Sequence, residues 1–357
     1  MDLIYWLLLL KVPKVGVRTF YKALAYFEEP RQIFLVNKSD LEKSKIFTAT
    51  SIDFILNIDK KIVQNCLNWQ QKKDCYIITL IDKKYPERLK KIIDPPPILY
   101  VRGNINLLNQ KQLAVVGSRN PTSGGSDNAR EFAKILSKYI VITSGMATGI
   151  DSSAHIGALN ASNNTIAVCG TGLDRVYPSR NKNLAKQIAT SGVLVSELPI
   201  GTAPLAGNFP RRNRIITGMS DGVLVVEALI KSGSMVSALS ALEQNRDVFA
   251  IPGSIKNPLT EAPHKLIQDG ATLVTKPEDI LFHLKLTDEI LKMTKINKNK
   301  VTAGDNILLK YLDYDGLSFD ELVIKSNLPS SEISAKLLEL ELGGIISEIN
   351  NTYTLKI

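Results

Sequence analysis

The sequence predicts an α/β protein. A Rossmann-like, doubly wound and mostly parallel sheet follows an N-terminal helical domain and precedes a C-terminal winged-helix domain. Three observations predict this fold. Short apolar segments rich in β-branched residues alternate with amphipathic segments over residues 75–285. Residues 1–70 have apolar side chains at helical spacing. Residues 304–357 contain three short helical patterns followed by two short strands.

Length, composition and charge agree with a multidomain protein that binds polyanions. The 357 residues suffice for two or three domains, 44% of them are hydrophobic, and the formal net charge is +9. Cys66, Cys75 and Cys169 have neither metal-ligand spacing nor a disulfide pattern, which indicates a reducing compartment and a cytoplasmic protein. The apolar start, MDLIYWLLLL, is too short to span a bilayer, so we expect a buried first helix and no membrane contact.

The N-terminal domain, residues 1–70, contains a candidate helix-hairpin-helix of the SAM-like kind. Between Leu10 and Leu24, Pro13 and Gly16 make a tight turn that joins two helical patterns. In such a motif the backbone amides of the turn approach a nucleic-acid backbone. The same pattern also fits an ordinary turn in a packing domain, so both interpretations remain open.

In the central domain, residues 75–285, nine segments have the length and composition of strands. They are YIITL, ILYVRG, LAVVGS, IVITSG, TIAVCG, VLVSELP, GVLVVEA, DVFAIPG and ATLV. The parallel strands are separated by enough residues for one helix each, as right-handed crossovers require. We therefore expect ligands to bind beyond the carboxyl ends of the strands.

The end of the chain reads as a linker and a winged helix. Residues 286–303 are polar and lysine-rich, which is typical of a linker, although a frayed helix extension fits as well. In residues 304–357 the helix starts are marked by Asp305, Ser318 and Ser330. The third helical pattern ends at a glycine pair and has three glutamates for one lysine: Gly343-Gly344, Glu332, Glu339, Glu341 and Lys336. DNA-reading helices are normally more basic, so we expect this one to contact protein or to pack.

Four central strands end in turns rich in glycine and hydroxyl residues, and each turn leads towards a helical pattern. The turns begin at Gly117 (GSRNPTSGG), Ser144 (SGMATGID), Cys169 (CGTGLD) and Lys231 (KSGS). Such turns point backbone N–H groups at phosphate. No Walker sequence occurs, and GSR does not match the dinucleotide fingerprint GxGxxG. Because the carboxyl ends of parallel strands share one edge, the four turns together predict an anion-binding edge.

The segment GNFPRRNRIITG is expected at the same edge. It places Arg211, Arg212 and Arg214 at the start of a helical pattern, where the helix dipole makes each cation unfavourable by up to about 1 kcal/mol. Arg119 adds a further cation, and Phe209 offers a face on which a nucleobase can stack, worth about 1–3 kcal/mol. Cations with an aromatic platform predict a site for single-stranded nucleic acid.

Nucleotide binding and catalysis would require residues for which the sequence gives little support. A dinucleotide fold needs an acidic residue at the end of its second strand, which here reads Thr143-Ser144-Gly145. Asp151 and His155 lie one helical turn apart and could act as acid and base, but a helix cap and a packed histidine explain them better. No metal-ligand cluster is visible in the sequence. We therefore expect no enzyme activity and no cofactor.

With these residues, the chain resembles the DNA-processing protein A family (DprA or Smf). Four segments carry the resemblance: VVGSRNPTSGG, TSGMATGIDSSAHIGAL, AVCGTGLDRVYPSRNKNL and SELPIGTAPLAGNFPRRNRIITGMSDGVLVVEALIKSGSMVSALSALEQNRDVFAIPGSI. The resemblance covers most of the chain. It implies a homodimeric, non-enzymatic recombination mediator. Such a protein protects incoming single-stranded DNA in natural transformation and helps to load the recombinase RecA on it.

The resemblance also implies, position by position, which residues bind DNA and which form the dimer surface. It places the DNA pocket at Gly117, Ser118, Arg119, Phe209, Arg211, Arg212, Asn213, Arg214, Ser232, Gly233 and Ser234. It places the dimer surface near His264, Ile267 and Leu273, where ordinary packing of the last helix and strand is the alternative.

Two other classes of protein stay open. The first is a nucleotide-sensing or nucleotide-hydrolysing domain, but its PGGxGTxxE signature is replaced here by EALIKSGSMVSA. The second is a winged-helix regulator with an α/β ligand sensor, against which the acidic third helix counts.

Overall fold

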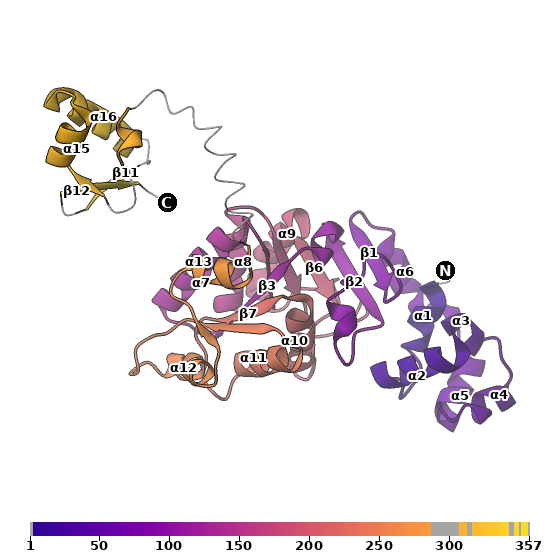
Figure 1. Cartoon of the computed structure of the whole chain (residues 1–357). Coiled ribbons are helices and arrows are strands. Elements are labelled where there is room, and N and C mark those ends of the chain that lie inside the picture. The colour runs from indigo at the N-terminus through magenta and orange to yellow at the C-terminus, as the bar shows by residue number, and fades with distance from the viewer. Residues whose placement is uncertain (1–2, 287–306, 313–315, 343–345, 350, 356–357) are drawn as a thin grey trace. The chain divides into compact units, whose positions relative to one another are not determined.

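The computed structural model describes residues 3–286, 307–312, 316–342, 346–349 and 351–355. Contacts between residues divide the chain into two compact units, Met1–Thr287 and Asp288–Ile357 (Figure 1). The helix start expected at Asp305, the glycine pair Gly343-Gly344 and all but the first residue of the expected linker lie outside the described residues.

The first unit begins with helices. They are α1 (Leu3–Leu9), α2 (Val17–Phe27), α3 (Pro30–Ile33), α4 (Lys38–Lys43), α5 (Ala49–Leu56), η1 (Lys60–Val63) and α6 (Gln64–Gln70). The turn between α1 and α2 contains Pro13 and Gly16, as the sequence predicts, while Lys14 has a positive φ of 60°. The carbonyl of Pro13 accepts a hydrogen bond from Ser51 Oγ of α5 at 2.9 Å, so this side of the turn is used internally. A contact between the turn and nucleic acid stays a prediction.

The sheet contains every strand that the sequence predicts. The strands are β1 (Cys75–Thr79), β2 (Ile98–Gly103), β3 (Gln112–Val116), β4 (Val141–Ser144), β5 (Thr165–Val168), β6 (Val193–Ser196), β7 (Gly222–Val225), β8 (Asp247–Ala250) and β9 (Thr272–Leu273). Their order is β1-β2-β6-β5-β4-β3-β7-β8-β9. β2 pairs antiparallel with both β1 and β6, and all the other neighbours are parallel. Every residue of β3 to β7 is buried, which explains their continuous apolar runs.

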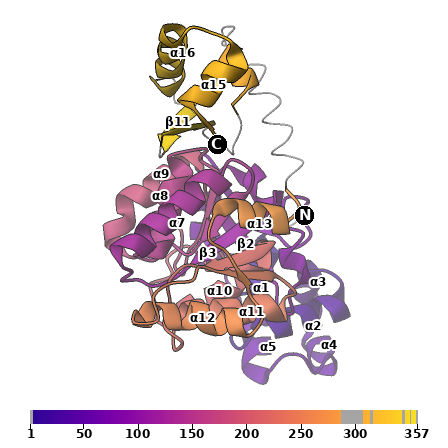
Figure 2. The same ribbon diagram turned by 60° about the vertical axis from the view of Figure 1, so that its left-hand side comes forward.

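Helices cover both faces of this sheet (Figures 1 and 2). On one face lie α7 (Ser123–Leu136), α8 (Ile150–Leu159), α9 (Lys182–Ser191) and α13 (Pro277–His283). On the other lie α10 (Asn208–Met219), α11 (Gly233–Glu243) and α12 (Glu261–Gln268). Short 3-10 helices occupy the connections: η2 (Leu89–Lys91), η3 (Ile105–Asn109), η4 (Ser179–Asn181) and η5 (Pro258–Thr260). The predicted Rossmann-like, doubly wound fold is confirmed.

The winding of the sheet reverses between β3 and β7. From β3 the chain proceeds through β4 and β5 to β6 on one side, and from β7 through β8 to β9 on the other. This topological switch point opens a crevice at the carboxyl ends of the strands, which is where doubly wound sheets bind ligands.

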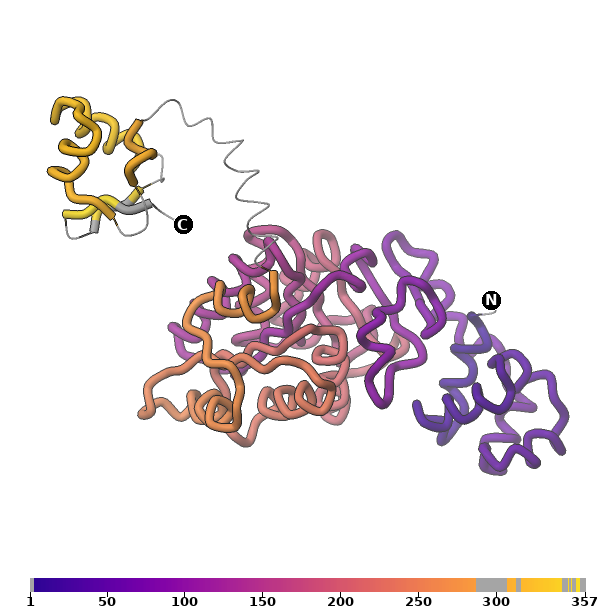
Figure 3. The backbone as a smooth tube through the Cα atoms, viewed as in Figure 1, coloured from indigo at the N-terminus to yellow at the C-terminus, as the bar shows by residue number. Residues whose placement is uncertain are grey.

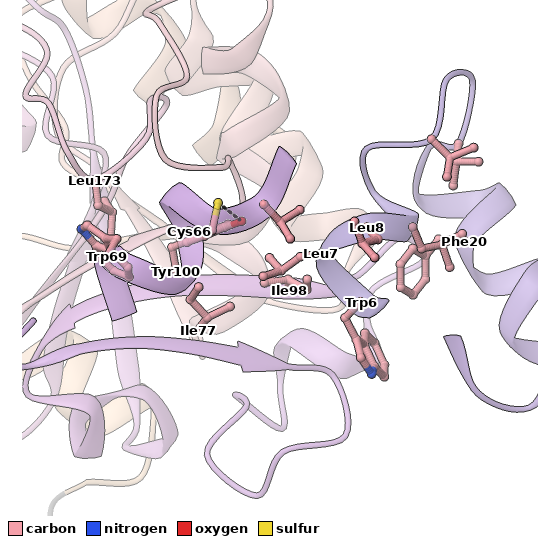
Figure 4. Packing of buried hydrophobic residues seen from close by; sticks show 14 of the residues in the cluster. Trp6, Leu7, Leu8, Phe20, Cys66, Trp69, Ile77, Ile98, Tyr100 and Leu173 are labelled. Carbon is pink, nitrogen blue, oxygen red and sulfur yellow. Dashed lines mark hydrogen bonds between the residues drawn. The ribbon is translucent and has the colours of Figure 1, made fainter. Parts of the chain in front are cut away.

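One hydrophobic cluster joins the N-terminal helices to the sheet. Trp69 of α6 packs against Tyr100 of β2 with ring centroids 6.0 Å apart, and Leu173 belongs to the same cluster (Figure 4). The Tyr100 hydroxyl donates a hydrogen bond to Cys66 Sγ at 3.4 Å. Figure 3 traces the backbone from these helices into the sheet. The domain boundary expected between residues 70 and 75 crosses this shared core, and it stays a prediction.

The second unit is a winged helix, as predicted. Its elements are η6 (Ile307–Lys310), β10 (Leu317–Ser318), α15 (Phe319–Ser326), α16 (Ser330–Leu342), β11 (Ile346–Ile349) and β12 (Thr352–Leu355), and its sheet has the order β10-β12-β11. Ser318 starts α15 through a capping box. Its Oγ accepts the Glu321 N–H at 3.3 Å, while the Glu321 carboxylate accepts the Ser318 N–H at 2.8 Å. The role expected for α16, contact with protein or packing, stays a prediction.

Candidate nucleic-acid interface

A pocket of about 400 Å³ lies at the switch point between β3 and β7. Three segments line it: the turn after β3, the first turns of α10 and the N-terminus of α11. The predicted site residues in its lining are Gly117, Ser118, Arg119, Phe209, Arg212, Asn213, Ser232, Gly233 and Ser234. The structure therefore brings together all the predicted DNA-binding residues except Arg211 and Arg214.

The N-terminus of α11 faces this pocket. Ser232 caps the helix, because its Oγ accepts the Met235 N–H at 3.2 Å. Gly233 and Ser234 are the first helical residues, so their N–H groups have no acceptor within the helix. Ser234 Oγ donates to the Gly117 carbonyl at 2.8 Å and thereby fixes α11 against the turn after β3. The positive end of the helix dipole adds to the positive potential of the pocket.

Arg119 supplies the exposed positive charge of the pocket. In the described part of the chain, no carboxylate lies within ion-pair distance of its guanidinium. The backbone of its turn is held in place, because Thr148 Oγ1 donates to the Arg119 carbonyl at 3.0 Å and the Asn120 N–H donates to Ser118 Oγ at 3.1 Å. The turn therefore presents a free guanidinium on a fixed backbone.

Arg212 lines the pocket, but its side chain is buried, so it is not an exposed cation. It is only 6% exposed, and its guanidinium donates to the carbonyls of Gly145 and Val168, directly beyond β4 and at the end of β5. Burial lowers the pKa of Arg212, an effect that the nearby Asp151 carboxylate opposes. Burial in turn raises the pKa of Asp151, although Arg212 and the N–H groups of Ala147 and Gly145 favour its charged form. Arg212 therefore ties two strand ends together, a role that the sequence did not predict.

Arg211 and Arg214 bind a carboxylate of the chain itself. Glu197, just after β6, accepts from Arg214 Nη2 at 2.5 Å and from Arg211 Nη2 at 3.2 Å. Arg214 also pairs through Nε with Asp94 at 3.2 Å and is 11% exposed, whereas the Arg211 side chain is 51% exposed. Burial raises the pKa of Glu197, and Arg214 and Arg211 oppose this rise. The charge of Arg214 is therefore balanced within the protein by Glu197, and of the two arginines only Arg211 has a side chain open to solvent.

In two of the four glycine-rich turns, carboxylates of the protein itself already accept the backbone N–H groups. At the N-terminus of α7, the Glu227 carboxylate accepts the Thr122 N–H at 2.8 Å and the Thr122 hydroxyl at 2.6 Å. A Cβ added to Gly125 would lie 2.4 Å from this carboxylate. In the turn after β4, Asp151 accepts N–H groups at 3.1 and 3.2 Å. The prediction that all four turns offer free N–H groups is wrong for these two.

The position of Glu227 bears on the nucleotide alternative. Dinucleotide folds bind a pyrophosphate at the N-terminus of the helix that follows the first strand of the nucleotide-binding unit. In this chain that helix is α7, and Glu227 supplies a carboxylate there. A phosphate at the same place would be repelled, which counts against a nucleotide site of the usual kind.

His155 is a packed residue. It is fully buried, and its Nδ1 lies 2.7 Å from Thr165 Oγ1. Burial, with a contribution from Arg212, lowers the pKa of His155 to about 3. Among the described residues, no group of histidine, cysteine, aspartate and glutamate side chains is arranged to hold a metal ion. Within the same residues, no helix has both the length and the apolar character needed to cross a membrane.

The residues of the expected dimer surface lie at the far edge of the sheet. His264 and Ile267 belong to α12, and Leu273 belongs to β9, the last strand. His264 Nε2 lies 3.1 Å from the Gly253 carbonyl oxygen. Ile267 is partly buried against the core, whereas Leu273 is 47% exposed.

Sequence reasoning missed several residues around the pocket, of which three bear on its chemistry. Leu229 lines it, Glu197 pairs with Arg211 and Arg214 outside the lining, and Tyr177 contacts Phe209 with ring centroids 5.2 Å apart. Two of them carried a signal in the sequence. Glu197 directly follows a strand of the ligand-binding edge, and Tyr177 is an aromatic residue between cations in DRVYPSR.

Together these features define a class: a doubly wound α/β protein with an electropositive pocket at its switch point, helices before it and a winged helix after it. The comparison with protein families agrees. The model of DNA recombination-mediator protein A matches residues 76–285, and the model of the DprA winged helix domain matches residues 298–348. The chain belongs to the DNA recombination-mediator protein A family, also called DprA or Smf.

Individual relatives support this assignment. The Smf protein of Escherichia coli K12 is 40% identical over 306 residues, which cover 84% of this chain and 82% of that protein. The crystal structure of DNA processing protein A from Streptococcus pneumoniae superposes with a TM-score of 0.70 at 38% identity, covering 78% of this chain and 96% of that one. DNA processing protein A from Helicobacter pylori has a TM-score of 0.54 at 31% identity, covering 59% of this chain and 96% of that one. Its structure concerns a single-stranded DNA binding mode.

Proposed function

We propose that this chain is a single-stranded DNA-binding recombination mediator without catalytic activity. The observation that carries the proposal is the pocket at the switch point. It combines the unpaired guanidinium of Arg119, the N-terminus of α11 and the ring of Phe209. The first two suit a phosphate, and the third suits the face of a nucleobase. The remaining lining residues that we assign to DNA are Gly117, Ser118, Asn213, Ser232, Gly233 and Ser234, and the exposed Arg211 adds a cation beside them.

Single-stranded DNA fits the pocket better than a duplex does. An aromatic platform needs an unstacked base, and bases inside a duplex are already stacked on their neighbours. The net charge of +9 favours a polymer of phosphates over a single anion. The relative from Helicobacter pylori, whose structure concerns binding of single-stranded DNA, supports the same ligand.

Membership of the family supports a proposal for the cellular role. We propose that the protein protects incoming single-stranded DNA during natural transformation and loads RecA on it in the cytoplasm. The description of the family as recombination mediators supports a recombinase as partner.

A fluorescence-anisotropy titration of the full chain tests the DNA-binding proposal. The ligands are labelled oligo-dT, the matching duplex and a labelled mononucleotide, each at two salt concentrations. We expect saturable binding of oligo-dT that weakens steeply with salt, and weaker binding of the duplex. Saturable binding of the mononucleotide alone would instead identify a nucleotide sensor and overturn the proposal.

We further propose that the protein is a homodimer through α12 and the edge strand β9. A strand at the edge of a sheet offers unpaired backbone groups to a second chain, and the exposed side chain of Leu273 lies on that edge. In a two-fold dimer the same patch of both chains forms the interface, so a charge introduced into this patch enters the interface twice. His264 and Ile267 lie on the adjoining helix.

Sedimentation velocity tests the dimer. We expect Leu273→Glu, and separately Ile267→Glu, to sediment as monomers, because like charges brought together cost several kcal/mol. Ile93→Glu is the control, because Ile93 is 88% exposed and lies outside α12 and β9. A dimer that persists in both variants would exclude this surface. The Leu273 variant guards against misfolding, because its side chain is half exposed already.

A further inference from the structure

The pocket does not end at Phe209. The ring of Tyr177, from the loop after β5, lies beside it with centroids 5.2 Å apart and an interplanar angle of 39°. This is within the range in which aromatic side chains attract each other. Tyr177 remains 50% exposed, so part of its ring is open to solvent. Phe209 itself lines the pocket, and the pair therefore extends the pocket wall by a second aromatic surface.

The ring of Phe209 is held in a fixed place. A Cβ on Gly170 would lie 2.7 Å from Phe209 Cδ1, so the ring rests directly on the backbone that follows β5. Only glycine permits this approach. Phe209 is thereby fixed between the pocket on one side and Tyr177 on the other.

The loop that carries Tyr177 is anchored at both ends. Asn181, which is 8% exposed, donates from Nδ2 to the Met146 carbonyl at 2.8 Å and to Ser152 Oγ at 2.9 Å. Before Tyr177, Asp174 Oδ1 accepts the Gly201 N–H at 2.8 Å. A half-exposed tyrosine on an anchored loop is a preformed surface, so little ordering is needed when a ligand binds.

Cations flank the tyrosine. Arg175 and Arg180 are exposed, and Arg175 pairs with the exposed Asp174 at 3.3 Å. Proteins that bind single strands combine such cations, which follow the phosphates, with aromatic rings that stack on successive bases. No apolar partner of the chain covers the open part of the ring, as far as the described residues show.

We propose that Tyr177 forms a second nucleobase subsite, which stacks on the base next to the nucleotide held at Phe209. The inference rests on the proposed binding of single-stranded DNA and adds to it the path of the strand. From the crevice at the switch point, the strand passes over Phe209 and Tyr177 towards the loop after β5. The ligand of the subsite is an unpaired nucleobase of any identity, because every base has a face that can stack.

The test is a titration of the full chain and its variants with oligo-dT, and with oligonucleotides that carry one abasic residue at successive positions. We expect Tyr177→Ala to weaken binding of oligo-dT by about five- to 150-fold, the range of one lost base stack. Tyr177→Phe and Tyr177→Trp should stay within about threefold of the wild type, because they keep an aromatic face. The slope of affinity against salt should not change, since no phosphate contact is lost. Tyr26→Ala is the matched control, because Tyr26 is 56% exposed and lies beside Phe27 at 4.8 Å.

The abasic oligonucleotides separate stacking from a structural role. If Tyr177 stacks on a base, one abasic position should abolish the difference between wild type and Tyr177→Ala while the other positions preserve it. A difference that persists at every position would overturn the subsite, as would equal binding by wild type and Tyr177→Ala. Failure of the wild type to bind any oligo-dT is a separate result, which removes the proposed function itself. Melting temperatures of all variants show whether each one is folded.

Discussion

Arg212→Ala lowers the free energy of unfolding of the first unit by about 3–5 kcal/mol, the usual loss when one partner of a buried charge pair is removed. The guanidinium is the donor for the carbonyls of Gly145 and Val168, and alanine leaves both without it. Burial raises the pKa of Asp151, and the variant also removes the nearby positive charge of Arg212 that opposes this rise. Arg212→Lys should recover little, because an ammonium cannot reproduce the planar fork of donors.

Urea unfolding followed by tryptophan fluorescence measures this effect. Both tryptophans, Trp6 and Trp69, lie in the first unit, so the signal reports on that unit alone. Arg119→Ala serves as the control and should change the unfolding free energy by less than about 0.5 kcal/mol, since Arg119 is exposed. An Arg212→Ala protein that unfolds at the wild-type urea concentration but binds oligo-dT weakly would show that Arg212 contacts phosphate and does not brace the strands.

Arg119→Ala weakens binding of oligo-dT by about 1–3 kcal/mol without a loss of stability, because a charge-assisted hydrogen bond to phosphate contributes in this range. Among the described cations of the predicted site, Arg119 has no carboxylate partner, whereas Arg214 pairs with Glu197 and Asp94. The slope of log affinity against log salt should fall by about 0.7, the value for one phosphate contact with a single strand. Anisotropy titrations at three or more salt concentrations provide both quantities.

The matched control for Arg119 is Arg130→Ala. Arg130 lies on α7, and its side chain is 45% exposed and pairs with Asp127 at 2.9 Å, so its removal takes the same formal charge from the protein. It lies outside the pocket lining, so its removal should change affinity much less than the removal of Arg119 does. Equal losses in the two variants would mean that only net charge matters, and the pocket would then not be the binding site.

The sheet could be predicted from the sequence because its strands are buried on both faces. ILYVRG coincides with β2, Ile98–Gly103, and LAVVGS covers all of β3 except Gln112. The antiparallel pairing of β2 with β6 could not be predicted, because neither strand has a sequence pattern that specifies its neighbour in the sheet. For the winged helix, Ser318 gave the start of α15 because a cap acts within one helical turn.

The candidate site was predictable only where a motif is local. The turn from Gly117 to Arg119 and the segment from Phe209 to Asn213 reach the same pocket because both lie at the ligand-binding edge. Which arginine stays free depends instead on carboxylates far away in the chain. Glu197 is 17 positions from Arg214 in the sequence, and Asp151, which favours the charged form of Arg212, is 61 positions from it. Counting charges along the sequence therefore could not distinguish Arg212 and Arg214 from Arg119.

The carboxylate of Glu227 at the head of α7 has a consequence for how such a protein works inside a cell. Free ATP, NAD and related metabolites are abundant, and many sheets of this type bind them at that helix end. In this protein the Glu227 carboxylate occupies that position and would repel the phosphates of such metabolites. If the proposed function holds, the crevice nearby binds a polymer through several weak contacts, and its occupancy does not vary with the concentration of these metabolites.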